Sequence, residues 1–138
     1  MQRPLPSKLP EARPYWDGID HGELRLQKCK RCGRLSSVPQ LVCPQDGSTG
    51  FEWVKASGKG VVHTFTVNPA HPHLAFQAEC PYVIAIVRLA EGVYCYTRIN
   101  VPPDQVQRVR IGMPVRAVFV NVSPDQKLVY FEPDAGEV

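Results

Sequence analysis

The chain has 138 residues, of which 43% are hydrophobic and 21% charged, with a formal net charge of +3. This length suggests one domain, or one domain with a small appendage, and the mild charge neither requires nor excludes a polyanionic partner. We expect a cytoplasmic protein, because no apolar run approaches a membrane span, no signal-peptide core follows Met1, and the five cysteines do not form a disulfide framework.

The first segment predicts an extended arm followed by a helix. Residues 1–9 are polar and rich in proline. The stretch from Ser7 to Gly22 carries an apolar stripe at helical spacing, which consists of Tyr15, Trp16 and Ile19. Pro14 and Gly18 oppose a helix, since each disturbs a helix interior. We expect the aromatic pair to pack on its own domain, with packing on a partner subunit as the alternative.

Two tight turns of the same design, at residues 29–33 and 43–47, flank a short apolar strand. Each begins with Cys, has a second candidate ligand three positions later, and ends in Gly, which readily adopts the left-handed turn conformation. Two ligands at this spacing face one tetrahedral metal. The pattern therefore predicts a rubredoxin-like zinc ribbon whose ligands are Cys29, Cys32, Cys43 and Asp46.

The fourth ligand position departs from a ribbon with four cysteines. An Asp oxygen binds zinc at about 2.0–2.2 Å, so three thiolates with one carboxylate are chemically allowed. A carboxylate is a harder ligand than a thiolate and is unusual in a structural site. The alternative is a ribbon that has lost its metal, in which Pro44 to Gly47 form an ordinary turn and the three thiols are bare.

After the ribbon the pattern changes to short segments separated by turn residues. The segments that predict strands are residues 51–56, 60–67, 82–89, 93–101, 115–122 and 127–132. Five main strands, with a weak helical turn at residues 104–107 between the third and the fourth, favour an OB-type barrel. We therefore expect a mostly β chain: an N-terminal arm and helix over residues 1–23, the ribbon over 24–53, and a five-stranded OB-fold barrel over 54–138.

The long loop at residues 68–81 is the strongest candidate for a contact site outside the ribbon. It carries His71 and His73 beside the apolar Leu74 and Phe76. Loops of this length in small barrels are usually functional or mobile, so we predict a partner or ligand contact, with solvated imidazoles as the alternative. Cys80 ends this loop, and neither histidine stands at a spacing that would require it to act as a base for this thiol.

No complete catalytic set is evident in the sequence, which lacks a serine elbow, a phosphate loop, a dinucleotide fingerprint and a paired carboxylate. The sequence therefore predicts a binding module. A ribbon joined to an OB barrel often binds nucleic acid, which predicts aromatic residues interleaved with Lys and Arg on one face. The strands offer Phe65, Tyr94, Tyr96 and Phe119, but the arginines are spread out, so nucleic-acid binding is the second candidate.

Several short motifs occur in order along nearly the whole chain. They are Arg13-Pro14-Tyr15-Trp16-Asp17-Gly18, Gly22 to Leu26, Cys29-x-x-Cys32-Gly33, Val38-Pro39, Cys43-Pro44, Gly58-x-Gly60, Pro81 to Val83, Glu91-Gly92 and Ile111 to Val115. Each motif alone is weak, but their order is specific. The chain resembles the acyl-CoA-associated zinc-ribbon/OB-fold proteins, a family long described as a domain of unknown function. It differs from the family pattern at Asp46, where the family has a fourth Cys.

This resemblance implies a non-catalytic small subunit of a heteromeric thiolase-like enzyme that acts on acyl-CoA thioesters as a thiolase, acyltransferase or side-chain aldolase. The larger subunit supplies the catalytic residues, while the small one docks on it and helps shape the acyl-CoA site; some relatives are fused to hydratase domains instead. A dimeric partner implies a two-plus-two heterotetramer. We expect structural zinc, acyl-CoA as a ligand of the complex, no membrane contact, and partner or acyl-CoA contacts through Tyr15, Trp16, His71, His73, Leu74 and Phe76.

Overall fold

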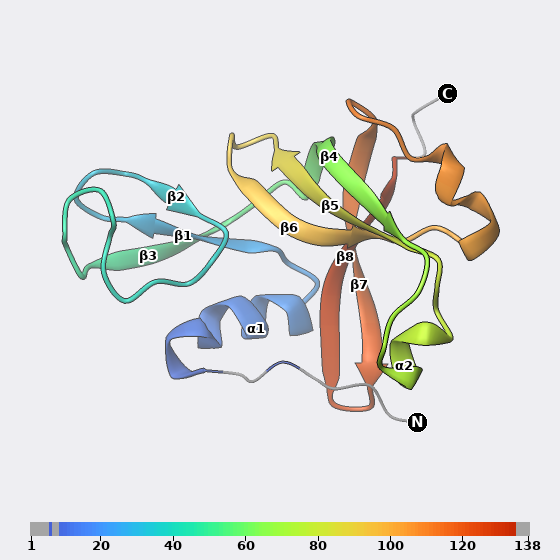
Figure 1. Ribbon diagram of the computed structural model, residues 1–138. Coiled ribbons are helices and arrows are strands. Elements are labelled where there is room, and N and C mark those ends of the chain that lie inside the picture. The colour runs from blue at the N-terminus through green and yellow to red at the C-terminus, as the bar shows by residue number, and fades with distance from the viewer. Residues whose placement is uncertain (1–5, 7–8, 135–138) are drawn as a thin grey trace.

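The computed structural model describes Pro6 and residues 9–134, in which a helix, a small ribbon and a barrel lie side by side (Figure 1). Most of the arm expected over residues 1–9, and the helix start expected at Ser7, lie outside the described residues. The predicted fold class is confirmed, since the chain is mostly strands with a short N-terminal helix, a ribbon and a closed five-stranded barrel. No helix in this described part is long and apolar enough to cross a membrane.

The N-terminal helix is shorter than the sequence pattern predicts. A 3₁₀ turn, η1 Pro10–Ala12, leads into α1 Arg13–Asp20. Pro14 lies in the first turn of α1, where its missing N–H breaks no intrahelical hydrogen bond, so it marks the helix start rather than disturbing it. Gly18 is needed for close packing, because a Cβ there would lie 2.8 Å from the side-chain carbons of Arg25. Pro14 and Gly18, which argued against a helix in the sequence, are therefore compatible with α1 at the positions they occupy.

The ribbon is an antiparallel sheet of three strands in the order β2-β1-β3. Its strands are β1 Arg25–Cys29, β2 Leu35–Ser36 and β3 Phe51–Lys55. The apolar strand expected between the two turns is only the two residues of β2, after which the chain leaves the sheet. That departing segment is held by Gln27, whose side chain donates to the Gln40 carbonyl and accepts from the Gln40 N–H, both at 2.9 Å.

The barrel closes in the order β4-β5-β6-β8-β7, with β4 pairing both β5 and β7. Its strands are β4 Lys59–Asn68, β5 Tyr82–Leu89, β6 Tyr94–Ile99, β7 Pro114–Ser123 and β8 Gln126–Pro133. All pairs are antiparallel except β6 with β8, where Ile99 lies opposite Phe131. The 3₁₀ segment η2 Pro103–Arg108 connects β6 to β7, as the OB arrangement of a helical connection after the third strand predicts.

The core runs without a break from the ribbon into the barrel. Leu24 and Leu26 come from the start of the ribbon and are 3% and 0% exposed. They belong to the same buried cluster as the barrel residues Val83 and Phe131. The helix α1 packs against both β1 and β8, so it covers the junction between the two sheets (Figure 1).

The loop between β4 and β5 contains a short helix that the sequence pattern did not predict, α2 Leu74–Gln77. The ring nitrogen Nδ1 of His73 accepts a hydrogen bond from the Ala75 N–H at 3.1 Å and so caps this helix. The His71 Nδ1 in turn accepts from the His73 N–H at 3.0 Å. Both imidazoles therefore support the local backbone of the loop.

Candidate metal centre

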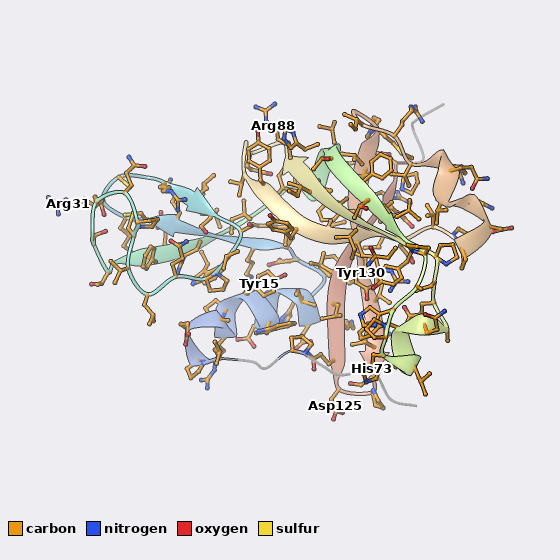
Figure 2. All side chains as sticks on the ribbon, in the orientation of Figure 1. Tyr15, Arg31, His73, Arg88, Asp125 and Tyr130 are labelled. Carbon is orange, nitrogen blue, oxygen red and sulfur yellow. The ribbon has the colours of Figure 1, made fainter. Side chains whose placement is uncertain are left out.

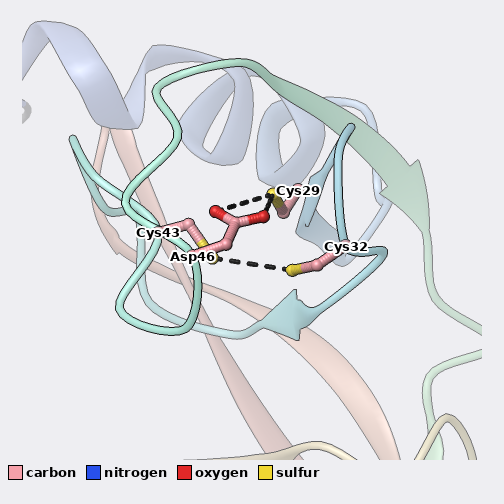
Figure 3. Close-up of side chains that lie close together, drawn as sticks. All are labelled: Cys29, Cys32, Cys43 and Asp46. Atoms are coloured by element: carbon pink, nitrogen blue, oxygen red, sulfur yellow. Dashed lines mark hydrogen bonds between the residues drawn. The ribbon is translucent and has the colours of Figure 1, made fainter.

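The ribbon brings the four predicted ligands together (Figure 3). Cys29 is the last residue of β1, and Cys32 lies in the turn that follows it. Cys43 and Asp46 come from the second turn, on the segment between β2 and β3. One ligand atom from each residue lies within 4.8 Å of each of the others. Residues that are far apart in the chain thus present three sulfurs and one carboxylate to a common point.

The distances within this cluster fit a tetrahedral zinc ion. With Zn–S bonds of about 2.3 Å, tetrahedral geometry places two sulfurs about 3.7–3.8 Å apart, and a sulfur and a carboxylate oxygen about 3.6 Å apart. The Sγ atoms of Cys32 and Cys43 are 3.7 Å apart. The Sγ of Cys29 lies 3.5 and 3.8 Å from the two carboxylate oxygens of Asp46. The donor set therefore has the size and the chemistry for structural zinc.

The two turns that carry the ligands have the same backbone geometry. In each, the glycine N–H donates to the carbonyl of the first cysteine at 2.9 Å, from Gly33 to Cys29 and from Gly47 to Cys43. Both glycines adopt a positive φ, of 77° and 74°, which a Cβ would resist. Asp46 therefore occupies the place in the second turn that Cys32 occupies in the first.

Ser48 contacts two members of the cluster, Cys29 and Asp46, and was not predicted from the sequence. Its hydroxyl lies 3.0 Å from the Cys29 Sγ, and its N–H donates to Oδ1 of Asp46 at 2.9 Å. An Asp side chain that accepts from the N–H two residues later forms an Asx-turn, so the sequence Asp46-Gly47-Ser48 did contain a local signal. Outer residues of this kind fix the orientation of metal ligands.

The surroundings favour charged forms of two ligands. The backbone N–H of Cys32 and the Ser48 hydroxyl lower the pKa of the Cys29 thiol to about 7. Hydrogen bonds from the backbone and side chain of Ser48 hold the pKa of the Asp46 carboxyl well below its usual range. For Cys32 the Arg34 N–H acts to lower the pKa, but desolvation and the neighbouring ligands outweigh it and raise the pKa to about 11. Zinc binding would displace the remaining thiol protons, as it does in other thiolate sites.

Two residues of the predicted contact set lie in one groove on the barrel, and the others do not. The groove has a volume of about 350 Å³, and aromatic rings from α1, the loop and three strands line it: Tyr15, Phe76, Tyr82, Tyr96 and Tyr130. Figure 2 shows Tyr15 and Tyr130 at the junction of α1 and β8. His71 and His73 do not line the groove, but their rings contact the Phe76 ring, with 4.9 and 5.8 Å between ring centroids.

The remaining two contact candidates lie elsewhere. Trp16 contacts the edge of Tyr15, with centroids 5.3 Å apart, but lines a separate hollow beside Arg13 and Asp17. Leu74 is 64% exposed on α2 and does not line this groove.

Arg98 is a further groove residue that the sequence pattern did not identify. Its guanidinium carbon lies 4.4 Å from the Tyr82 ring centroid and 5.3 Å from that of Tyr130, within cation–π range. The guanidinium also forms an ion pair with Glu79, at 2.5 Å. These contacts join three strands, β5, β6 and β8, and the loop after α2, which is why no local sequence pattern predicts them.

Comparison with known proteins agrees with this architecture. The model of the ChsH2 rubredoxin-like zinc ribbon domain matches residues 16–52, and that of the ChsH2 C-terminal OB-fold domain matches residues 53–120. The chain is 32% identical to a chain of the solved Ltp2-ChsH2(DUF35) aldolase, with a TM-score of 0.79, and the match covers 95% of this chain and 98% of that one.

Two curated relatives differ in length from this chain. One is the 3-oxo-4,17-pregnadiene-20-carboxyl-CoA hydratase alpha subunit of Mycobacterium tuberculosis, 37% identical over 97% of this chain but over only 40% of its own length. The other is a DUF35 domain-containing scaffold protein of Methanocaldococcus jannaschii, 39% identical over 71% of this chain and 68% of its own. The chain thus spans two-fifths of the hydratase subunit. Its ribbon, its barrel and these matches show that the chain belongs to the ChsH2 (DUF35) family of zinc-ribbon/OB-fold proteins.

Proposed function

We propose that this chain is the non-catalytic small subunit of a heteromeric thiolase-like enzyme that acts on acyl-CoA thioesters. The observation that carries the proposal is the match to the solved Ltp2-ChsH2(DUF35) aldolase, which covers 98% of the matching chain there. The name of that assembly joins two components, and the curated relatives are named as an alpha subunit and as a scaffold protein. All three names fit a protein that works as part of an assembly.

The metal centre supports a structural role for the ribbon. Zinc held by Cys29, Cys32, Cys43 and Asp46 has four protein ligands and no open position for a substrate or a reactive water. When bound, zinc would clamp the two turns of the ribbon to each other. Within the described residues, this is the one group of His, Cys, Asp and Glu side chains placed to hold a metal. In this proposal the reaction therefore takes place on the partner.

The groove is the proposed contact with the partner and its acyl-CoA. It is lined by the rings of Tyr15 and Phe76, and aromatic anchors of this kind contribute most of the binding energy in protein interfaces. Leu74 and Trp16 do not line this groove, but each is close in sequence to a residue that does: Trp16 follows Tyr15 on α1, and Leu74 lies on α2 with Phe76. We infer that the partner packs across this surface with its acyl-CoA entrance beside the groove. A dimeric partner would then give two small and two large subunits by symmetry.

Co-purification from the native host tests the assignment. The tagged full chain should retain a thiolase-like chain in a one-to-one ratio, whereas recovery of nucleic acid or of no partner would count against it. Phe76→Ala and Trp16→Ala should each reduce retention of the partner by tenfold or more, as roughly 1.4 kcal/mol of lost binding energy would do. The matched control is Ile111→Ala, which removes a 68% exposed apolar side chain outside the groove. If both variants retain the partner as well as the control does, the docking surface lies elsewhere.

Activity measurements separate this proposal from its competitors. Turnover of acyl-CoA should require the thiolase-like chain, so turnover by the small subunit alone, lost in Cys80→Ala, would instead indicate a thiol enzyme. A nucleic-acid-binding protein would bind single-stranded oligonucleotides with a steep salt dependence. The pairing of Arg98 with Glu79 and two aromatic rings leaves this guanidinium engaged within the protein, which favours the enzyme-subunit proposal.

A further inference from the structure

The four candidate ligands of the ribbon differ in how readily they can be oxidised. Cys32 is exposed, while Cys29 and Cys43 are buried. The fourth ligand, Asp46, is a carboxylate and has no sulfur to oxidise. We propose that the ribbon is a thiol switch, in which a hydroperoxide oxidises Cys32 and Cys43 to a disulfide and the zinc is released. This inference rests on the zinc site proposed above and goes beyond the scaffold function.

The geometry selects one pair of sulfurs. The Cys32 and Cys43 Sγ atoms already face each other at 3.7 Å, as the dashed line in Figure 3 marks, so a disulfide of about 2.05 Å requires them to close by roughly 1.7 Å. The Cys29 sulfur instead contacts the Ser48 hydroxyl, at 3.0 Å, and the Asp46 carboxylate. Cys29 is also only 1% exposed, so an oxidant reaches Cys32 first.

The chemistry balances with a hydroperoxide as the two-electron oxidant. The Cys32 thiolate attacks the terminal peroxide oxygen, the O–O bond breaks, and the leaving alkoxide takes a proton to become an alcohol. The product at Cys32 is a sulfenic acid. The Cys43 thiolate then attacks the Cys32 sulfur, an S–S bond forms, the S–O bond breaks, and hydroxide leaves as water after taking a proton. Two thiolates are oxidised and one peroxide is reduced.

Asp46 makes the release of zinc a consequence of this single disulfide. Once Cys32 and Cys43 are joined, Cys29 and Asp46 are the remaining ligands of the set, and one of them is a hard oxygen donor. A ribbon with a fourth cysteine would keep two thiolates and would bind the metal more tightly before oxidation. The new disulfide would meanwhile hold the two turns together in place of the metal. Oxidation thus replaces the zinc ion with a disulfide as the link between the two turns.

The experiment uses the full chain, purified without chelator and loaded with zinc. Hydrogen peroxide is added in substoichiometric steps while a chromogenic chelator reports free zinc, a thiol reagent counts cysteines, and peptide mapping locates cross-links. We expect one zinc released for each pair of thiols lost, a peptide joining Cys32 to Cys43, and recovery of zinc binding after treatment with a dithiol. A cross-link through Cys29, or loss of zinc with no cross-link, would overturn the proposal.

Two variants sharpen this test. Asp46→Cys should release zinc at least tenfold more slowly at the same peroxide concentration, because a fourth soft ligand holds the metal more tightly. Cys80→Ser removes a half-buried thiol outside the cluster and should leave the rate and the stoichiometry unchanged. Equal release rates in Asp46→Cys and the parent would refute the role of Asp46. A purified parent with its fold intact but under a tenth of an equivalent of zinc would instead refute the zinc site itself, and with it the switch.

Discussion

The substitution Gly60→Ala should destabilise the barrel at the place where it closes. Gly60 pairs with Leu89 of β5 on one side and with Val115 of β7 on the other. A Cβ at this position would lie 2.7 Å from the carbonyl oxygen of Arg88 and 2.7 Å from Cγ1 of Val87. Real Cβ contacts are essentially never this short. Because one neighbour is backbone and the other is a fully buried side chain, β5 must shift to admit the methyl group.

The expected loss of stability follows from two opposing terms. Inserting one methyl group into a packed site costs about 1–3 kcal/mol. Replacing Gly by Ala also restricts the unfolded chain, which returns about 0.4–1 kcal/mol. The net loss should be about 1–2 kcal/mol. Gly50→Ala is the matched control, since the nearest atom to its Cβ would be a flexible Lys30 side-chain carbon at 4.0 Å, and it should leave stability unchanged or slightly increased.

Urea unfolding followed by tryptophan fluorescence and far-UV circular dichroism measures both variants against the parent. We expect Gly60→Ala to lower the midpoint with an unchanged slope, which reports a loss of stability rather than a change in the surface exposed on unfolding. If Gly60→Ala unfolds at the same midpoint as Gly50→Ala, the close approach of β4 and β5 at this point does not limit the packing of the barrel.

Further predictions concern the metal centre, pH and the core. Ser48→Ala should weaken zinc binding by roughly 10–100-fold, measured by competition with a chelator, because it removes the hydroxyl beside Cys29; an unchanged affinity would show that this contact is dispensable. Burial raises the pKa of Tyr15 from 10.0 to about 12. The folded state therefore holds the Tyr15 proton more tightly than the unfolded state does. The resulting contribution to the free energy of unfolding, at most about 2–3 kcal/mol, is complete below pH 10 and is lost by about pH 12. Tyr15→Phe should flatten this alkaline decline in urea titrations, and parallel declines in variant and parent would contradict the assignment. Phe131→Ala, at a side chain that is 0% exposed, should cost about 3–5 kcal/mol in thermal or urea unfolding; a loss below about 1 kcal/mol would mean that the barrel core collapses around the gap.

The fold was predictable where local pattern and tertiary environment agree. The strand at Tyr82–Leu89 was placed at its observed bounds, because both of its faces are largely covered and all its residues except Arg88 are β-branched or apolar. The convergence of the four candidate ligands was predictable for a related reason, since two such residues three positions apart followed by Gly are typical of a metal-binding turn. The strand between the turns was overestimated, because Val38, Leu41 and Val42 look like strand residues but are exposed.

Features that depend on distant residues could not be predicted in this way. Gly18 reads as a helix breaker until the side chain of Arg25 is seen against it. The groove combines α1, the loop with α2, and strands β5, β6 and β8, so only the closed barrel brings its rings together. His73 caps a helix of only four residues, which is too short to show a periodic pattern.

The unbroken core between the ribbon and the barrel makes the two a single cooperative unit. Leu26 leaves the barrel cluster only if β1 separates from it, and β1 ends at the candidate metal ligand Cys29. Free energy gained when zinc binds the ribbon therefore adds to the stability of the whole chain by mass action, not to the ribbon alone. A partner that binds the barrel and an ion that binds the ribbon would each raise the unfolding temperature of the same body. Loss of either one would then lower the unfolding temperature of the ribbon and the barrel together.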